Sequence, residues 1–464
     1  MSYLFRILLI VVSVTQLVTG CSTRETEKPT ASRKAGIGNV LATTTLLATI
    51  TADDKPQSIA PPSGLGIHPS PANMFQFIFS ERGGGVAYVV EKDGTSRMVH
   101  NGAAGKSYQT VGDVVLSPDG KRIAYGALVD GKWRMVVDGK EGAPFNTVRL
   151  PRFSPDGAHL AYQAMAGERW HLVVDGTPNA GTLKRYLPHE FSADSSRIAC
   201  IDDVDDNNRG RLVVSDLAFA TQTVVGSGVS FMLANADKSR IAAVSTMDGK
   251  QRVIDFSLDR PESVNRGAIY DTVGALAFGP DGVTLAYPAE RAGRRLLVVG
   301  NRELALPDGD MAGLPVIHPD KKTVAVPIFS GGMTFLHQLS PVGGIGEVGH
   351  GYEAVEGLVY GRDGRFHAYA AQKGETWFVV VNGKEGPTFD RVVSPKFSPD
   401  GKLLVYRARK DGKRFVVVAD MTARTIKAHP AYEQVFDAVF TADGKSVAYG
   451  VKDGNRLIWK VEAL

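Results

Sequence analysis

One ten-residue motif recurs along the chain and constrains the possible fold more than any other feature. Its best copies are LSPDGKRIAY from Leu116, FSPDGAHLAY from Phe153 and FSPDGKLLVY from Phe397. Counting weaker copies, the aspartate position falls at residues 82, 119, 156, 194, 237, 281, 320, 363, 400 and 443, a spacing of 37 to 44 residues. A period near 40 is the length of a four-stranded propeller blade.

Each unit also contains three turn signals that separate short apolar runs. Ser-Pro-Asp-Gly suits a β-turn, because proline sets φ at its second position and aspartate and glycine tolerate the remaining positions. Asp130-Gly131 follows eleven residues after Asp119, and Asp138-Gly139 comes next. Asp-Gly between apolar runs is the strongest short-range hairpin signal. We therefore expect four antiparallel strands, A to D, in every unit.

Composition agrees with a fold rich in turns. Glycine accounts for 51 of 464 residues, and helices tolerate glycine poorly. We predict an all-β fold, a β-propeller of four-stranded antiparallel blades with about ten repeats over residues 75–464. A single large ring is our first choice, because no spacing leaves room for an interdomain linker. Ten units exceed the usual four to eight blades, so two smaller propellers are the alternative.

Two distant segments show how strict the repeat is. Asp138 to Gly157 and Asn382 to Gly401 align without gaps and share 12 of 20 residues. These units resemble the Ser-Pro-Asp-Gly repeats of TolB-type propellers, a WD-repeat-like group also found in the propeller halves of prolyl oligopeptidases. The resemblance implies a bacterial envelope protein that binds another protein or a cell-wall polymer. It assigns no single activity, because one fold serves many functions.

The N-terminus has the features of a targeting signal. Residues 1–20 are typical of an export signal, with Arg6 followed by an apolar stretch too short to span a bilayer. Val18-Thr19-Gly20-Cys21 resembles a bacterial lipobox, which implies that Cys21 is lipidated and anchors the chain to a membrane. Ser22, where an aspartate would retain the protein in the inner membrane, implies the periplasmic side of the outer membrane in a Gram-negative cell. An ordinary signal peptide is the alternative.

Residues 21–74 are predicted to be a tether that contains a possible closing strand. The last unit provides only three strands before the sequence stops, and an open sheet edge invites aggregation. The apolar, β-branched segment Asn39 to Thr51 is the nearest unassigned strand. We predict that it pairs with the final unit.

Catalytic and metal motifs are sparse. A prolyl-oligopeptidase activity would need a hydrolase domain with Gly-x-Ser-x-Gly, which the sequence lacks, and the ten histidines show no compact metal spacing. Asp203, Asp205 and Asn207 alternate as in a calcium loop, but Asn208 and Val214 replace the glycine and glutamate expected there. We interpret this run as a solvated loop and expect no metal and no cofactor.

Four further residues have both a structural and a functional interpretation. Trp133, Trp170 and Trp377 each follow their motif aspartate by fourteen residues, which favours a repeated packing position over a ligand platform. Cys200 replaces the tyrosine that ends strand B in other units. Because Cys21 is assigned to lipidation, Cys200 is expected to be a small buried side chain.

The hairpins between strands B and C are rich in cations. Equivalent loops of a propeller lie on one face, so modest charges can add up and attract an anionic partner. The candidate residues, one from each of four units, are Arg134, Arg295, Lys413 and Arg456. Ordinary solubilising charge on exposed loops is the alternative. The net charge of +4 is too small to indicate nucleic-acid binding.

Taken together, these features predict a non-catalytic envelope lipoprotein that binds a protein or a cell-wall polymer. The alternative is a propeller enzyme, a polysaccharide lyase or hydrolase. Such an enzyme would need His, Arg, Glu or Tyr side chains from different units to converge at the mouth of the channel.

Overall fold

We analysed a computed structural model of the chain, which describes residues 42–58, 76–180, 188–340, 344–347 and 349–464. These residues form 41 β-strands. Within the described ranges there is no helix long and apolar enough to cross a membrane. The predicted signal peptide, Cys21 and most of the tether lie outside the described residues.

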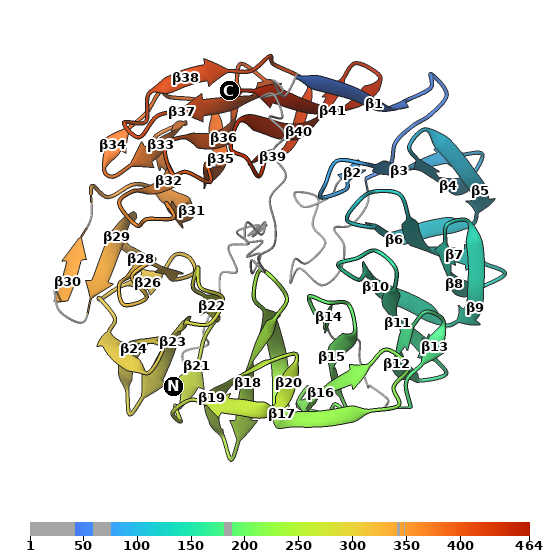
Figure 1. Cartoon of the computed structure of the whole chain (residues 1–464), viewed down its shortest axis with the longest axis horizontal. Coiled ribbons are helices and arrows are strands. Elements are labelled where there is room, and N and C mark those ends of the chain that lie inside the picture. Colours follow the sequence, from blue (N-terminus) through green and yellow to red (C-terminus); the bar gives the residue numbers. More distant parts are fainter. Residues whose placement is uncertain (1–41, 59–75, 181–187, 341–343, 348) are drawn as a thin grey trace, which may run out of the picture.

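The strands of the described residues pair into nine sheets, and every pairing between strands is antiparallel. Eight sheets contain one repeat unit each, and the seven-stranded sheet contains two units that share the long strand β17. Figure 1 shows the sheets following one another in chain order around a circle, and in units such as 2, 3, 9 and 10 the first strand lies nearest the centre. The predicted all-β propeller of four-stranded antiparallel sheets is confirmed.

The strands of the first five units are β2 (Ile78–Phe79), β3 (Val86–Lys92), β4 (Thr95–His100), β5 (Ala103–Tyr108), β6 (Thr110–Leu116), β7 (Ile123–Val129), β8 (Lys132–Val137), β9 (Lys140–Phe145), β10 (Thr147–Phe153), β11 (Leu160–Ala166), β12 (Arg169–Val174), β13 (Thr177–Pro178), β14 (His189–Phe191), β15 (Arg197–Asp202), β16 (Gly210–Asp216), β17 (Gln222–Ala234), β18 (Arg240–Met247), β19 (Lys250–Ser257) and β20 (Arg260–Arg266). Strand β17 is both strand D of unit 4 and strand A of unit 5.

The strands of units 6 to 10 are β21 (Thr272–Val273), β22 (Ala277–Phe278), β23 (Leu285–Arg291), β24 (Arg294–Val299), β25 (Arg302–Ala305), β26 (Asp310–Met311), β27 (Val316–Ile317), β28 (Val324–Ser330), β29 (Met333–Ser340), β30 (Gly344–Glu347), β31 (Ala354–Tyr360), β32 (His367–Lys373), β33 (Thr376–Val381), β34 (Lys384–Glu385), β35 (Arg391–Phe397), β36 (Leu404–Lys410), β37 (Lys413–Ala419), β38 (Thr425–Ala428), β39 (Gln434–Phe440), β40 (Ser446–Asp453), β41 (Arg456–Ala463) and β1 (Thr43–Thr49).

The Ser-Pro-Asp-Gly motif forms a hydrogen-bonded turn between strands A and B. In unit 2 the hydroxyl of Ser117 donates to Asp119 Oδ1 at 2.7 Å and accepts the Arg122 N–H at 3.0 Å. Asp119 Oδ1 also accepts the Lys121 N–H at 3.2 Å. These bonds lower the pKa of Asp119, and the bond from Ser117 has the largest effect. The motif aspartates therefore act as turn formers, as predicted.

The two Asp-Gly turns have the backbone geometry of tight hairpins. Asp130 and Gly131 have φ of 50° and 74°, and Asp138 and Gly139 have 50° and 81°. Two successive positive φ angles define the type I′ turn, whose twist matches that of paired strands. The alternation of strand direction places the B–C hairpins and the D–A connections on one face of the molecule. We call it the B–C face, and the opposite face, which carries the A–B turns, the A–B face.

The last unit is completed by the N-terminal strand. β1 pairs with β41 from Thr43, opposite Val461, to Thr49, opposite Arg456, in the sheet order β1-β41-β40-β39. This is the pairing predicted for the segment Asn39 to Thr51, of which residues 39–41 lie outside the described part. Ala48 and Ile50 join a buried cluster with Phe77 of unit 1 and Leu457 of unit 10.

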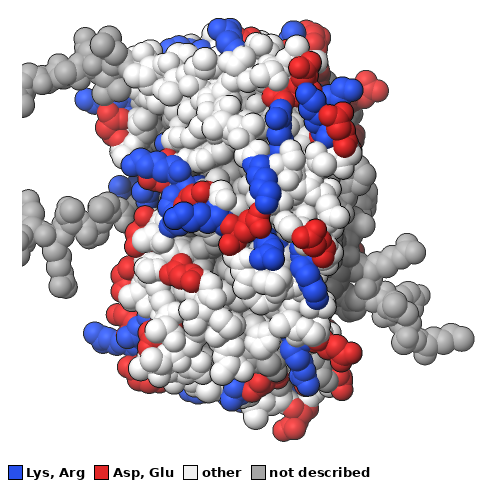
Figure 2. Space-filling view, turned by 90° about the vertical axis from the view of Figure 1, so that its right-hand side faces the viewer, with Lys and Arg blue, Asp and Glu red and all other residues white. Residues whose placement is uncertain are grey.

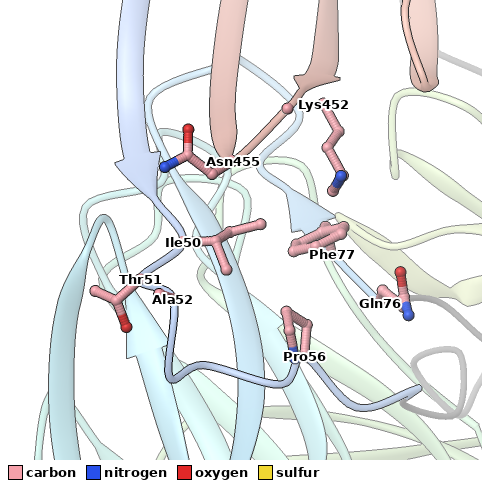
Figure 3. Close-up of a pocket in the computed structure, with 9 residues that line it drawn as sticks. Ile50, Thr51, Ala52, Pro56, Gln76, Phe77, Lys452 and Asn455 are labelled. Atoms are coloured by element: carbon pink, nitrogen blue, oxygen red, sulfur yellow. The ribbon is translucent and has the colours of Figure 1, made fainter.

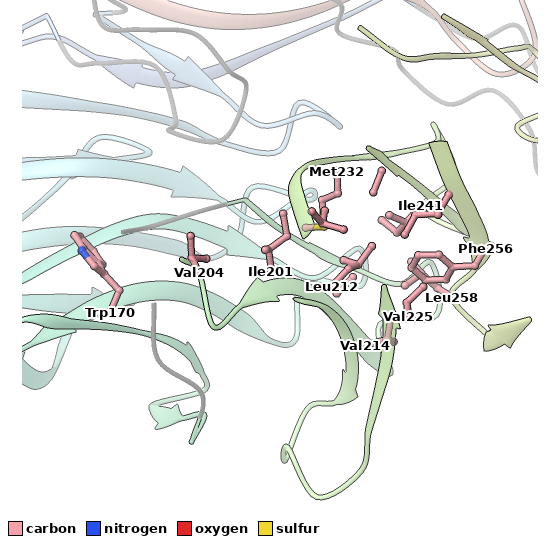
Figure 4. Packing of buried hydrophobic residues seen from close by; sticks show 14 residues of the cluster. Trp170, Ile201, Val204, Leu212, Val214, Val225, Met232, Ile241, Phe256 and Leu258 are labelled. Carbon is pink, nitrogen blue, oxygen red and sulfur yellow. The ribbon is translucent and has the colours of Figure 1, made fainter. Parts of the chain in front are cut away.

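The hydrophobic core lies between neighbouring sheets. The cluster in Figure 4 joins Trp170 of unit 3, Leu212 of unit 4 and Phe256 of unit 5. Similar clusters join other neighbouring units, for example units 8 and 9. Because each unit buries its apolar side chains against the next, the packing connects the units in series around the circle.

The innermost strand is interrupted in units 6 and 7. Here strand B contains Pro288 and Pro327, which pair outward with Leu297 and Leu336. Proline has no N–H to donate to an inner neighbour. Accordingly, strand A is split into β21 and β22 in unit 6, and into β26 and β27 in unit 7.

Candidate functional site

The B–C face brings together the four cations selected from the sequence. Arg134, Arg295, Lys413 and Arg456 all lie at the beginning of strand C, beside the B–C hairpin of their units. Their surroundings differ. Arg134 is half-buried, 3.8 Å from Glu141, and donates to the Gly142 carbonyl at 2.9 Å. Arg456 pairs with Asp453 of its own hairpin at 2.6 Å. Arg295 and Lys413 are exposed.

Carboxylates neutralise part of the positive charge on this face. Arg291 pairs with Glu303 at 2.9 Å and Arg211 with Asp203 at 2.6 Å, and Lys250 pairs with Asp271. Figure 2 likewise shows cations and anions side by side on one side of the molecule. The face is therefore a mixed surface, and its positive charge is concentrated at particular hairpins.

Large apolar side chains are exposed on the B–C face between units 5 and 7. Met247 at the B–C hairpin of unit 5 is 62% exposed, and Ile269 in the following D–A connection is 49% exposed. Phe329, at the B–C end of β28 in unit 7, is 43% exposed. Arg294 and Arg295 are also exposed, on the intervening unit 6. Contiguous exposed apolar patches with a polar rim mark protein-binding surfaces, so these three apolar side chains are the candidate contacts of this face.

The innermost strands are linked from unit to unit by ion pairs. Arg149 of β10 lies 3.2 Å from Asp113 of β6, and Arg152 lies 2.7 Å from Glu190 of β14. On another part of the circle Lys396 of β35 lies 2.6 Å from Asp437 of β39. Burial raises the pKa of Glu190, but Arg152 and Lys238 outweigh it and hold this pKa below the usual value. These groups are engaged with one another and connect neighbouring units.

A β-bulge recurs in the same innermost strands and shapes this region. The pairing register shifts around Asp113 in β6, Leu150 in β10, Gly357 in β31 and Ser394 in β35. Each residue lies six positions before its motif aspartate and has a positive φ, between 37° and 63°. A bulge redirects side chains locally, and here it turns Asp113 toward unit 3, where it accepts the Leu150 N–H at 3.1 Å. Sequence reasoning missed both the bulges and the ion pairs.

His, Glu, Tyr and Lys side chains meet between units 9 and 10, where His429 and Tyr449 are buried and Lys460 and Glu462 are partly buried. Glu462 accepts hydrogen bonds from Tyr449 at 2.6 Å and Lys460 at 2.8 Å, and it also contacts Nδ1 of His429. His429 is 4% exposed and Tyr449 is 0% exposed. Burial lowers the pKa of His429, and the effect of Glu462 opposes it only in part. The set therefore holds two units together, in a place that a polymer substrate does not reach.

The acidic loop of unit 4 uses its carboxylates within the protein. Arg211 contacts Asp202 at 3.1 Å and Asp203 at 2.6 Å. Asp205 accepts the N–H groups of Asn207 at 2.8 Å and Arg209 at 2.9 Å. Within the described ranges no three His, Cys, Asp or Glu side chains gather as a metal site.

The tryptophans and the cysteine have packing roles. Trp170 and Trp377 are each 7% exposed within core clusters, and Trp133 packs on the cluster between units 2 and 3. The packing interpretation of these three residues is confirmed. Cys200 is buried, and burial raises the pKa of its thiol to about 12.

A pocket of about 410 Å³ lies at the junction of the first and last units. Ile50 and Pro56, which follow β1, and Phe77, which precedes β2, form its apolar wall. Lys452 and Asn455 of the last B–C hairpin also line it, as Figure 3 shows. Lys452 is engaged with Glu433. The pocket marks the position at which the closing strand meets unit 1.

Comparisons with known proteins give structural likeness only. No protein-family model and no curated protein matches the chain. Among solved structures, a eukaryotic initiation factor is 13% identical with a TM-score of 0.44, covering 75% of this chain and 96% of that one. TolB from Acinetobacter baumannii is 15% identical with a TM-score of 0.29, covering 68% and 80%.

A third solved structure is an enzyme. Oligogalacturonate lyase from Vibrio parahaemolyticus is 12% identical with a TM-score of 0.32, covering 76% of this chain and 96% of that one. At these values the likeness concerns the propeller fold alone and assigns no function.

Proposed function

We propose that the protein is a non-catalytic lipoprotein of the cell envelope, whose propeller binds another protein through the B–C face. The observation that carries this proposal is the exposure of Met247, Ile269 and Phe329 on that face. Burying apolar side chains of this size contributes about 1.5–3 kcal/mol each. The exposed Arg295 and Lys413 on the same face suit a partner with an acidic surface.

The arrangement of the titratable groups also supports binding over catalysis. The innermost carboxylates Asp113, Glu190 and Asp437 are each occupied by a cation of a neighbouring unit. His429 and Tyr449 are buried. We therefore place the protein among binding scaffolds, as the TolB-type resemblance suggested, and the polysaccharide lyase or hydrolase remains the less supported alternative.

In-cell photocrosslinking tests the proposal. A photoreactive amino acid is introduced at Met247 or Phe329 on the B–C face, or at Val283 on the A–B face as a control. Val283 lies in the A–B turn of unit 6 and is 53% exposed, so it matches the other two in exposure. We expect the same partner protein to be captured from Met247 and Phe329 and not from Val283. Capture from Val283 alone, or capture from none of the three positions, would contradict the proposal.

A further inference from the structure

The hairpin between β36 and β37 carries four exposed cations, Arg409, Lys410, Lys413 and Arg414. The register places Arg409 directly opposite Arg414, and Lys410 directly opposite Lys413. Like charges in directly opposed positions destabilise a pair of strands. Among the described residues, Arg409 and Lys410 form no ion pair that would offset this repulsion, whereas Glu433 attracts Lys413. The hairpin thus carries a local cost that its own fold relieves only in part.

Arg409, Arg414 and Arg407 form a row, called the arginine row, that extends from the surface into the interface between units 9 and 10. Arg407 precedes Arg409 by two residues and lies on the same side of β36, because side chains alternate along a strand. Its Nη1 lies 3.3 Å from the Val435 carbonyl, and its buried Nε has no hydrogen-bond partner in the described part of the chain. Arg414 Nη1 donates to the Glu433 carbonyl at 2.6 Å. The guanidinium groups thus contact backbone carbonyls, which carry no net charge.

The carboxylates nearest this row are already paired. Glu433 contacts Lys452 of the next hairpin, and Asp437 pairs with Lys396 at 2.6 Å. Asp437 also attracts Arg407, whereas Arg409 and Arg414 form no ion pair in the described part of the chain. Arginine binds carboxylates through two parallel N–H···O bonds, so a row of guanidinium groups suits a ligand with closely spaced carboxylates.

We propose that the Arg409–Arg414 side of this hairpin binds an acidic peptide segment of the partner protein. This inference rests on the proposed function, because it assigns part of the B–C face to one element of the partner. The segment lies along the junction of units 9 and 10, with its Glu or Asp side chains on Arg409 and Arg414.

The described part of the chain begins on the face opposite to the arginine row. β1 runs from the A–B face, where Thr43 lies opposite Val461, to the B–C face, where Thr49 lies opposite Arg456. The choice of a peptide rests on the carboxylate geometry that guanidinium groups bind.

Direct binding to a defined probe tests the inference. The full mature chain is titrated into a fluorescent peptide of six consecutive glutamates, and anisotropy is recorded at several salt concentrations. We expect R409Q/R414Q to bind at least tenfold more weakly than the wild type, with a shallower salt dependence. The control K121Q/K402Q removes the same charge from the A–B face, where each lysine lies near its own motif aspartate, at 3.4 and 3.6 Å. It should bind like the wild type.

Two further measurements separate the possible results. The variant R409K/R414K keeps the charge without the guanidinium geometry, and we expect intermediate binding. Thermal unfolding of each variant verifies the fold. Equal binding by R409Q/R414Q, equal loss in both glutamine variants, or binding to phosphatidylglycerol vesicles but not to the peptide would overturn the inference. If crosslinking from Phe329 persists in any of these cases, the proposed function stands and the acidic-segment inference alone fails.

Discussion

The hydroxyl of Tyr449 donates a 2.6 Å hydrogen bond to the carboxylate of Glu462. At a different position of the repeat, in the D–A connection, Tyr270 donates to Glu303 at 2.8 Å and Tyr352 donates to Glu385 at 3.1 Å. Phe145 and Phe389 occupy the position of Tyr270 and Tyr352, eleven residues before the motif aspartate, and Pro178 and Thr422 stand at the position of the two glutamates. Tyrosine and glutamate thus occur together across the repeats. We infer that these contacts, in which the tyrosine is buried, support the fold.

The first prediction compares two tyrosines at one position of the repeat. Tyr449→Phe should lower the free energy of unfolding by about 1.5–3 kcal/mol, because it removes a hydrogen bond to a charged group. Tyr406→Phe should cost less, because the buried Tyr406 hydroxyl has Thr425 and no carboxylate beside it. Chemical denaturation of both variants measures the difference. Equal losses would contradict the assigned role of Glu462.

The second prediction concerns acid sensitivity. His189 is 1% exposed, and burial together with the nearby Arg152 lowers its pKa to about 3. Unfolding restores a pKa near 6.5, so the unfolded chain binds one more proton between these values. Stability from this group is complete at pH 7 and decreases as the pH falls. At pH 5 the loss reaches about 2 kcal/mol.

The variant His189→Leu isolates this contribution. His189 is uncharged at pH 7 and its ring meets only the backbone of Ala161 among the described residues, so leucine should cost little at this pH. We expect the difference in melting temperature between pH 7 and pH 5 to be smaller in the variant than in the wild type. His429 titrates in the same direction and should leave a residual pH dependence. An unchanged difference would show that His189 does not control the acid response.

The third prediction tests the closing strand with two substitutions on β1. Ala48 is 4% exposed and packs against the first and last units, whereas Leu46 is 56% exposed. Ala48→Glu should lower the free energy of unfolding by about 2–4 kcal/mol, because it buries an unpaired charge. Leu46→Glu adds the same charge at the surface and should change little. Thermal unfolding distinguishes them, and deleting residues 39–51 should lower the melting temperature of the whole domain.

The repeat made the fold predictable, because each turn has its own local chemistry. Ser117 and Asp119 close the A–B turn by themselves, and Asp130-Gly131 forms a hairpin turn through its own φ angles. The partner of the Asn39 to Thr51 segment followed from counting strands. The turns depend only on neighbouring residues, and the closing strand was inferred from the strand missing in the last unit. A single sequence was therefore sufficient to predict both.

The candidate site was less predictable, because it depends on which residues of different units face one another. The sequence drew attention to Arg134, but it could not show that Glu141 lies beside it. The opposition of Arg409 and Arg414 does follow from the two-residue Asp411-Gly412 turn, but the sequence could not show that Arg414 contacts the Glu433 carbonyl. The only available signal was four cations around one Asp-Gly turn. The bulges escaped detection because Leu150 and Ser394 are not residues that usually favour a positive φ.

The last prediction concerns the anchor, which lies outside the described residues. Cys21→Ser should move the protein from the membrane fraction to the soluble fraction, because a thioether-linked lipid cannot form on serine. Mass spectrometry of the wild-type N-terminus should detect acyl chains on Cys21. Ser22→Asp serves as the matched variant: it keeps the cysteine, so the protein should stay lipidated, and in a Gram-negative cell it should shift from the outer to the inner membrane. A wild-type protein without acyl chains would remove the basis for envelope anchoring, while binding through the B–C face would remain open to the crosslinking test.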